Sequence, residues 1–256
     1  MSAVSRAFAV LDAFSDESTA LRLTTIARRA GLPVPTTLRL VRELVSWGGL
    51  ERQADGSYRL GTRLWAIGAR VPCTRRLVEA GRPHLRRLHA ATGHAVHLAV
   101  AHGRSALVVD ELGGTVRTGD HLPLHATAAG KVLLAHAAAP LRLEILTGRG
   151  GSAGTGRGGL VRLTPHTITA PGLLDRQLAA IRAGSPATAD EEWKPGRREI
   201  AAAVPMPDGR QVAALALTAP SAAAVRRAAP QLVRAAAAIR SALAAASPSA
   251  AAHPGG

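Results

Sequence analysis

The stretch GLPVPTTLRLVRELVSWGGLERQADGSYRLG, residues 31–61, has the pattern of a helix followed by a two-stranded ribbon. At about 100° per residue, the polar side chains of the helical part fall within an arc of about 120°. The apolar side chains centre on the opposite side, as in a helix that packs one face against a core. The polar set is Thr36, Arg39, Arg42, Glu43 and Ser46, and the apolar set is Leu38, Val41, Leu44 and Val45.

A second helix is predicted directly before this one. LTTIARRAG, residues 23–31, has Ile26 and Ala27 on a buried stripe and ends at Gly31. Pro35 suits the first turn of the helix that follows. Two helices joined by a short glycine-containing turn, the second with arginines on one face, form the helix-turn-helix arrangement of DNA-binding proteins.

The ribbon after the second helix is predicted to be a wing. ERQADGSYRL, residues 51–60, has Asp55-Gly56 as its turn, and Arg52 and Arg59 could reach phosphate or the minor groove. A lone amphipathic helix would be read as a solvated charged face, but the order of helix, turn, helix and wing favours DNA binding. The candidate DNA-binding residues are Thr25, Pro35, Thr36, Thr37, Arg39, Arg42, Arg52 and Arg59.

Composition supports an anionic partner. The chain has 256 residues, 47% of them apolar, and a formal net charge of +15, which favours nucleic acid. The charge is uneven, with a net of +2 over residues 1–60 and +6 over residues 61–92. The segment after the wing is therefore expected to supply much of the attraction to the DNA backbone.

Several classes of protein are disfavoured. The single cysteine, Cys73, excludes an intramolecular disulfide and a multi-cysteine zinc site. On a strand His94 and His97 would face opposite sides, which disfavours a shared metal site. No apolar run of about 18 residues and no signal peptide are found. We expect a cytoplasmic protein with no membrane association, no cofactor and no metal.

The chain is predicted to form two domains. Residues 1–61 are expected to form the winged helix-turn-helix, 62–74 a linker helix, 75–245 an effector-binding domain and 246–256 a disordered tail. Within the second domain, TGRGGSAGTGRGG, residues 147–159, is of low complexity and is predicted to be a mobile loop.

The second domain is predicted to contain an antiparallel sheet. An Asp208-Gly209 hairpin turn sets the register of its flanking strands, so that paired residue numbers sum to 417. One face is then bulky and apolar, with Ile200 opposite Leu217. The other is small, with Ala201 opposite Ala216 and with Glu199 and Thr218 at its end. A small face leaves room for either a ligand or a closely packed helix.

A helix is predicted to start near Thr127 in LPLHATAAGKVLLA, residues 122–135. The backbone N–H groups of Ala128 and Ala129 would lie in its first turn. Unpaired N–H groups at the start of a helix attract carboxylates and other anions. An ordinary capped helix, with a purely structural Lys131, is the alternative.

Segments in both halves resemble the IclR-type transcriptional regulators. VSRAFAVLDAF and DGSYRLGTRLWAIG resemble the winged helix of that family, and LPLHATAAGKVLLA and DEEWKPGRREIAAAVPMPDGRQVAALALTAP its effector-binding domain. The resemblance implies an α+β chain: a winged helix-turn-helix, a linker helix and a GAF-like or PAS-like antiparallel sheet with helices. It also implies a homodimer or homotetramer that binds operator DNA and a small metabolite.

The predicted function is a ligand-responsive transcriptional regulator, and we expect a repressor rather than an enzyme. The alternative is a metabolite-binding protein or enzyme that uses only the second domain, which would have no need of a winged helix. With the resemblance, the small face is favoured as a ligand site. The candidate effector-binding residues are Leu122, Thr127, Ala128, Ala129, Asp190, Glu199, Ala201, Ala216 and Thr218.

The chain departs from the family pattern at Glu199, where the family commonly has a cysteine. A buried unpaired carboxylate is costly and would repel an anionic ligand. Arg197 or Arg198 could neutralise it, or it could hold a hydroxyl, amine or amide of a ligand opposite Thr218. The second outcome is favoured, because neighbouring residues on a strand point to the other face or lie a full step away. Simple anions such as glyoxylate or pyruvate are expected to bind poorly.

Two further segments carry expectations. Leu64, Trp65 and Ile67 in TRLWAIGARV, residues 62–71, form an apolar helical set that is predicted to pack against a second chain. Packing on its own winged helix is the alternative. The acidic run at residues 190–192 is expected to be a solvated loop or the rim of a pocket.

Overall fold

A computed structural model describes residues 2–14, 20–68, 71–148, 160–209 and 211–246. The chain divides into two compact units, Met1–Arg75 and Arg76–Gly256. Most of the predicted glycine-rich loop (149–159) and of the predicted tail (247–256) lies outside the described residues. No helix in the described ranges is long and apolar enough to cross a membrane.

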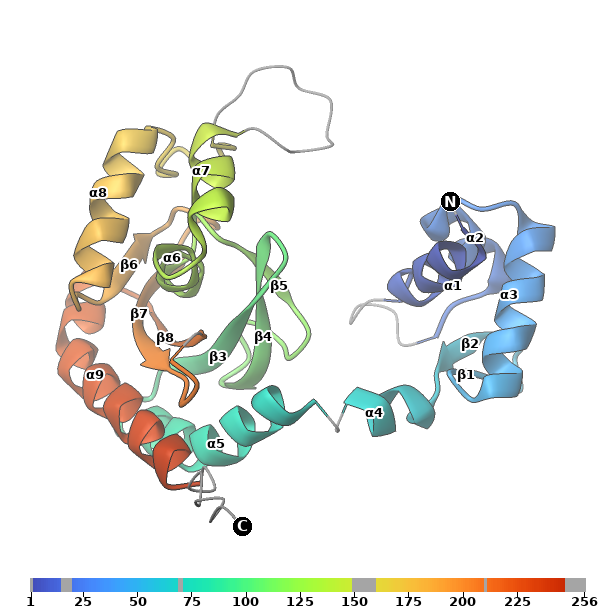
Figure 1. Cartoon of the computed structure of the whole chain (residues 1–256), viewed down its shortest axis with the longest axis horizontal. Coiled ribbons are helices and arrows are strands. Elements are labelled where there is room, and N and C mark those ends of the chain that lie inside the picture. The colour runs from blue at the N-terminus through green and yellow to red at the C-terminus, as the bar shows by residue number, and fades with distance from the viewer. Residues whose placement is uncertain (1, 15–19, 69–70, 149–159, 210, 247–256) are drawn as a thin grey trace, which may run out of the picture. The chain divides into compact units, whose positions relative to one another are not determined.

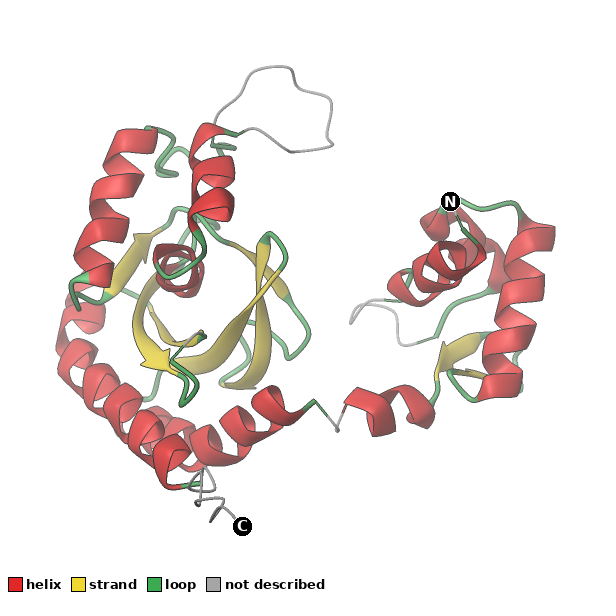
Figure 2. Ribbon diagram, viewed as in Figure 1, coloured by secondary structure: helices red, strands yellow, loops and turns green. Residues whose placement is uncertain are grey.

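Three helices and a short ribbon make up most of the N-terminal unit (Figures 1 and 2). Left-handed glycines end two of the helices: Gly31 (φ 64°) follows the second and Gly48 (φ 82°) the third. The core includes Val10, Ile26 and Val41, one from each of these helices, and Tyr58 from the ribbon. The elements are α1 Ala3–Asp12, α2 Leu23–Ala30, α3 Val34–Trp47, β1 Leu50–Arg52, β2 Tyr58–Leu60 and α4 Thr62–Gly68.

A six-stranded antiparallel sheet in the order β5-β4-β3-β8-β7-β6 organises the C-terminal unit. The sheet curls around α6, while α5 and α9 cover its outer face (Figures 1 and 2). The predicted α+β fold is confirmed. The elements are α5 Pro72–Thr92, β3 Ala95–His102, β4 Ser105–Leu112, β5 His121–Pro123, α6 Ala128–Ala135, α7 Ala139–Thr147, α8 Pro171–Arg182, β6 Ala187–Asp190, β7 Arg198–Pro205, β8 Val212–Ala219 and α9 Ala222–Ala245.

The register of β7 and β8 is the one predicted from the Asp208-Gly209 turn. Glu199 pairs with Thr218 and Ala201 with Ala216. The bulky face of the sheet packs with α5 and α9 in one core, and the small face packs with α6 in another. Because the small-face side chains are mostly alanine, α6 lies close to the sheet.

The small face extends across β3 and β6 by the same register. One row across the sheet runs Ala95, Thr218, Glu199, Ala189. The next row runs His97, Ala216, Ala201, Ala187. We call the small-residue face of these two rows the alanine floor.

Candidate functional site

Arginines line the exposed side of α3. Arg39 and Arg42 are exposed, as are Pro35 and Glu43, and Thr36 is half-buried. The opposite side of the helix contributes Leu40 and Val41 to the core. This separation leaves α3 free to present one charged face to a partner.

Thr37 corrects the predicted set of DNA-contacting side chains. It is fully buried, and its hydroxyl donates to the carbonyl oxygen of Pro33 at 3.0 Å. The hydroxyl satisfies a backbone acceptor one turn earlier, so its side chain is not available to a base. Thr25 is half-buried on α2.

The wing presents two arginines of different character. Arg52 is exposed at the end of β1. Arg59 on β2 donates to Glu51 at 2.7 and 2.9 Å. The hydrogen bond from Arg59 is the main reason that the pKa of Glu51 lies below its usual value. Part of the charge of Arg59 is therefore already compensated within the wing.

The start of α6 is fixed by Thr127 and Gly130. The Thr127 hydroxyl accepts from the Gly130 N–H at 3.0 Å and donates to the carbonyl oxygen of Pro123 at 2.8 Å. A Cβ on Gly130 would lie 2.3 Å from that same oxygen. Only glycine therefore allows the β5–α6 connection to approach this closely. The predicted helix start at Thr127 is confirmed.

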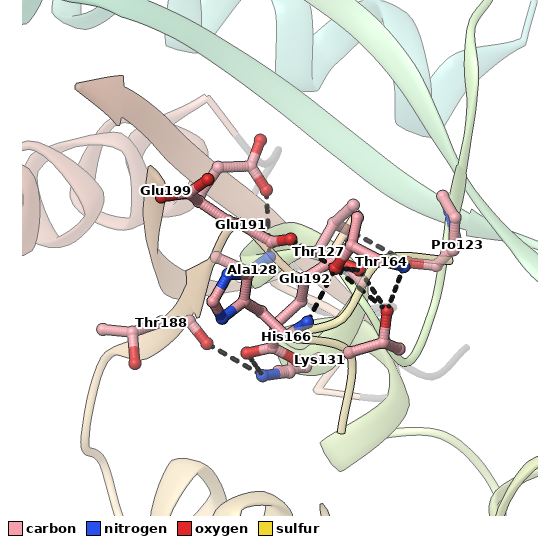
Figure 3. A network of polar contacts seen from close by, with 12 residues as sticks. Pro123, Thr127, Ala128, Lys131, Thr164, His166, Thr188, Glu191, Glu192 and Glu199 are labelled. Atoms are coloured by element: carbon pink, nitrogen blue, oxygen red, sulfur yellow. Dashed lines mark hydrogen bonds and ion pairs between the residues drawn. The ribbon is translucent and has the colours of Figure 1, made fainter. Parts of the chain in front are cut away.

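The carboxylate of Glu199 reaches the first turn of α6. Its Oε2 accepts from the Ala128 N–H at 3.2 Å (Figure 3). The side chain is buried, and the Thr218 hydroxyl lies 3.5 Å from Oε1. The candidate effector residues on α6, β7 and β8 are thus brought together.

Arg197 neutralises Glu199, contrary to the outcome favoured from the sequence. Its Nε donates to Glu199 Oε1 at 2.7 Å, and a terminal nitrogen lies 2.5 Å from the same oxygen. Arg197 stands two residues before Glu199, just ahead of β7, and its long side chain spans that two-residue separation. Its other contacts are the carbonyl oxygen of Thr115 at 3.0 Å and the ring of Trp193 at 4.9 Å.

His97 is a polar side chain of the alanine floor that sequence reasoning considered only as a metal ligand. It is fully buried, and neither ring nitrogen has a hydrogen-bond partner. Burial lowers its pKa to about 4, although the charge of Glu199 opposes this shift. His97 lies in the row next to that of Glu199, but the pairing of β3 with β8 that places it there joins segments far apart in the sequence, and no local pattern predicted it.

A second buried ion pair fastens the middle of α6. Lys131 Nζ lies 2.6 Å from Glu192 Oε1 and donates to the carbonyl oxygen of Thr188 at 2.9 Å (Figure 3). Burial lowers the pKa of Lys131, and the charge of Glu192 opposes the shift. The Thr167 hydroxyl donates to the backbone oxygen of Glu192 at 2.7 Å. Glu192 is buried, so it does not belong to a solvated loop, and the other alternative, the rim of a pocket, stays a prediction.

Asp190 lies off the alanine floor. On β6 burial alternates, so that Ala189 is buried beside Glu199 and Asp190 is exposed. The Asp190 carboxylate pairs with Arg198 at 2.8 Å. Strand alternation thus places the Asp190 side chain on the side away from the alanine floor, while Leu122 is buried in the core beside α6.

Two surface hollows of about 310 Å³ each lie elsewhere in this unit. One lies between α5 and α9 and includes His84, Arg87 and Arg234. The other includes Pro186, Ala203 and Val233. Neither includes a candidate effector residue. Within the described residues, no three histidine, cysteine or acidic side chains are grouped as a metal site.

The N-terminal unit is a helix-turn-helix with a wing, and the C-terminal unit is a curved sheet that buries a polar cluster beside the start of a helix. Together these units define a DNA-binding regulator with an effector domain. Comparison with known proteins gives the family. Residues 3–54 match the IclR helix-turn-helix domain, and residues 73–245 match the C-terminal domain of bacterial IclR transcriptional regulators. The chain belongs to the IclR family. It is a ligand-responsive DNA-binding transcriptional regulator and not an enzyme, which removes the alternative based on the second domain alone.

Relatives match along most of the chain. The HTH-type transcriptional regulator XynR of Escherichia coli K12 is 30% identical over 222 residues, which cover 84% of each chain. The regulator BhcR of Paracoccus denitrificans is 32% identical over 226 residues, 86% of this chain and 77% of that one. An IclR homologue from Microbacterium hydrocarbonoxydans, solved in complex with 4-hydroxybenzoate, is 34% identical with a TM-score of 0.84, covering 96% of this chain and 100% of that one.

Proposed function

We propose that this regulator binds operator DNA through the exposed side of α3 and the wing, and that an effector bound at the alanine floor changes that binding. One observation carries the DNA-binding part: Arg39 and Arg42 are exposed on the second helix of the helix-turn-helix while its other side is packed into the core. We further propose that the protein acts as a repressor in the cytoplasm.

Arg39→Ala is expected to weaken specific operator binding by about 1–3 kcal/mol, the usual size of a lost base contact or charged contact. Arg52→Ala is expected to weaken binding more evenly across sequences, because a phosphate contact carries no sequence information. Arg59→Ala is expected to cost less than Arg52→Ala, since Glu51 already compensates Arg59. Gel-shift titrations with operator and unrelated DNA measure these differences.

Arg176→Ala is the matched control for these variants, because Arg176 is an exposed arginine on α8 of the other unit. Circular dichroism establishes that each variant is folded. A folded Arg39→Ala protein with unchanged operator affinity would remove α3 from the proposed interface.

The effector is proposed to bind over the alanine floor, against the start of α6. The floor offers small side chains beside three polar groups, those of His97, Thr218 and Glu199. The homologue in complex with 4-hydroxybenzoate is similar in structure over 96% of this chain. A small ligand of that size is therefore proposed, with a polar group directed at this cluster.

A thermal-shift screen of acids, phenols, sugars and amines tests the effector site, with 4-hydroxybenzoate included for comparison with the homologue. A ligand at 100 times its Kd stabilises the native state by about 2.7 kcal/mol. The hit must also shift operator affinity, and it must lose affinity for a Thr218→Val variant. A hit that leaves operator binding unchanged argues against an effector role.

Assembly as a homodimer or homotetramer is also proposed. Trp65 on α4 is 77% exposed, and Ile67, Val71, Val4 and Phe8 are exposed as well. Apolar side chains concentrated on α1 and around α4 are typical of a surface that another chain covers. A second copy would also supply the second DNA-binding unit that a two-fold operator requires.

Trp65→Asp is expected to shift the protein toward the monomer and to weaken operator binding by at least tenfold, because a buried charge in a protein interface is costly. Light scattering at micromolar concentration measures the mass. Val161→Asp, at a 63% exposed valine of the other unit, is the matched control. A wild-type protein that is monomeric with and without DNA would contradict the proposal.

A further inference from the structure

The anion-binding position at the start of α6 is taken by a carboxylate of the same chain. Helix N-termini carry unpaired N–H groups and a partial positive charge, so they bind anions. Here the Ala128 N–H donates to Glu199 Oε2 at 3.2 Å (Figure 3). The Gly130 N–H is bonded to the Thr127 hydroxyl. A ligand carboxylate would therefore have to displace Glu199 to reach Ala128.

The nearby cation is taken as well. The side chains of Arg197 and Glu199 are 9% and 1% exposed, and they pair at 2.5 Å. Lys131 is paired with Glu192 in the same way. The buried charges around the start of α6 thus cancel in pairs. An added anion would bring an uncompensated charge into a buried site and would lie beside the carboxylate of Glu199, which is unfavourable on both counts.

Among the described side chains of this cluster, His97 is one whose polar atoms all lack a hydrogen-bond partner. A neutral imidazole has one N–H donor and one acceptor nitrogen, and both are buried and unpaired. His97 faces the same side as Thr218 and Glu199, with Ala216 beside it on β8. By this register His97 lies beside Ala216, and Thr218 follows Ala216 on the same face of β8. A hydroxyl or a carboxamide satisfies His97, because each can both donate and accept.

We infer that the Glu199 carboxylate occupies the position that the carboxylate of a ligand would otherwise take. The effector of this regulator is then an uncharged molecule with a hydroxyl or amide group directed at His97. This inference rests on the proposed effector site at the alanine floor. It assigns Glu199 as the residue that sets ligand specificity, by closing the site to carboxylates.

Chemical rescue of Glu199→Ala tests the inference without knowledge of the effector. The substitution removes a side chain that ends in an acetate-shaped group, and it leaves Arg197 without its carboxylate partner and the Ala128 N–H without its acceptor. Acetate is expected to raise the Tm of this variant by about 3–6 °C at ten times its Kd. Acetamide has the same shape without the charge and is expected to have little effect, and sodium chloride controls for ionic strength. The wild type is expected to respond to acetate no more than to chloride.

With folded protein, two results would overturn the inference. Equal stabilisation of wild type and Glu199→Ala by acetate would show that the anion position is open beside Glu199. No preference of the variant for acetate over acetamide would show that the position does not bind a carboxylate. Where the variant does not fold in chloride, refolding in acetate but not in acetamide supports the inference, and failure in both overturns it. The experiment measures the Tm of the protein in the absence of DNA. Its result therefore does not depend on the proposed operator binding, which gel-shift titrations test separately.

Discussion

Glu192→Ala is expected to lower the free energy of unfolding of the effector domain by about 3–5 kcal/mol, the usual effect of breaking a buried ion pair from one side. Lys131 is fully buried and has its ammonium 2.6 Å from Glu192. Removal of the carboxylate leaves that ammonium with the carbonyl oxygen of Thr188 as its remaining hydrogen-bond partner. The domain must then bury a poorly compensated charge or release α6 from β6.

Urea denaturation at pH 7, with amide hydrogen exchange of α6 as a local reporter, measures this loss. Asp190→Ala is the matched control, because the 67% exposed Asp190 carboxylate also pairs with a cation, Arg198. An exposed pair contributes about 0–1 kcal/mol. The double variant Lys131→Met with Glu192→Met is expected to recover much of the stability, since apolar side chains of similar volume can replace a buried pair. Equal losses for Glu192→Ala and Asp190→Ala would contradict the expectation.

The Lys131–Glu192 pair also supports the proposed effector site. It ties the middle of α6 to the loop after β6, three residues beyond the N–H of Ala128 that receives Glu199. Movement of α6 would change the geometry at its first turn. We therefore expect Glu192→Ala to impair both stability and the ligand response.

The sequence predicted what local rules determine. The Asp208-Gly209 turn gave the register of β7 and β8, because a two-residue hairpin leaves no freedom in pairing. The apolar and polar arcs of α3 identified its buried and exposed sides, since a helix repeats every 3.6 residues. The start of α6 followed from Thr127, which caps it as predicted.

Partners that depend on tertiary structure were not predicted. Lys131 and Glu192 lie 61 positions apart, and no local pattern joins them. The Arg197–Glu199 pair was considered but disfavoured, because strand geometry alone does not show how far an arginine side chain reaches. Thr37 was assigned to the DNA face, although its hydroxyl bonds to the backbone one turn earlier. These errors concern side-chain partners rather than secondary structure.

Acidification is expected to destabilise the effector domain through His97. Its pKa is about 4 in the folded chain, against about 6.5 in an unfolded chain. Between these values the unfolded state binds more protons, so stability rises with pH. The stability associated with neutral His97 is fully present above pH 6.5. It is lost as the pH falls, and the free energy of unfolding is lower by about 3 kcal/mol at pH 4. The cause is burial, which the attraction of Glu199 and Asp120 only partly offsets and which Arg197 reinforces.

His97→Gln isolates this contribution, because it removes the titrating ring while the acidic groups that also titrate below pH 5 stay in place. Between pH 7 and pH 4 the free energy of unfolding of the wild type is expected to fall by about 3 kcal/mol more than that of His97→Gln. His102→Gln, at an exposed histidine of the same strand, is the matched control. A difference that stays constant over this range would show that His97 does not titrate with a lowered pKa. An effector that bonds to neutral His97 should in turn bind more weakly as the pH falls toward 4, because protonation removes the acceptor nitrogen that the ligand would use.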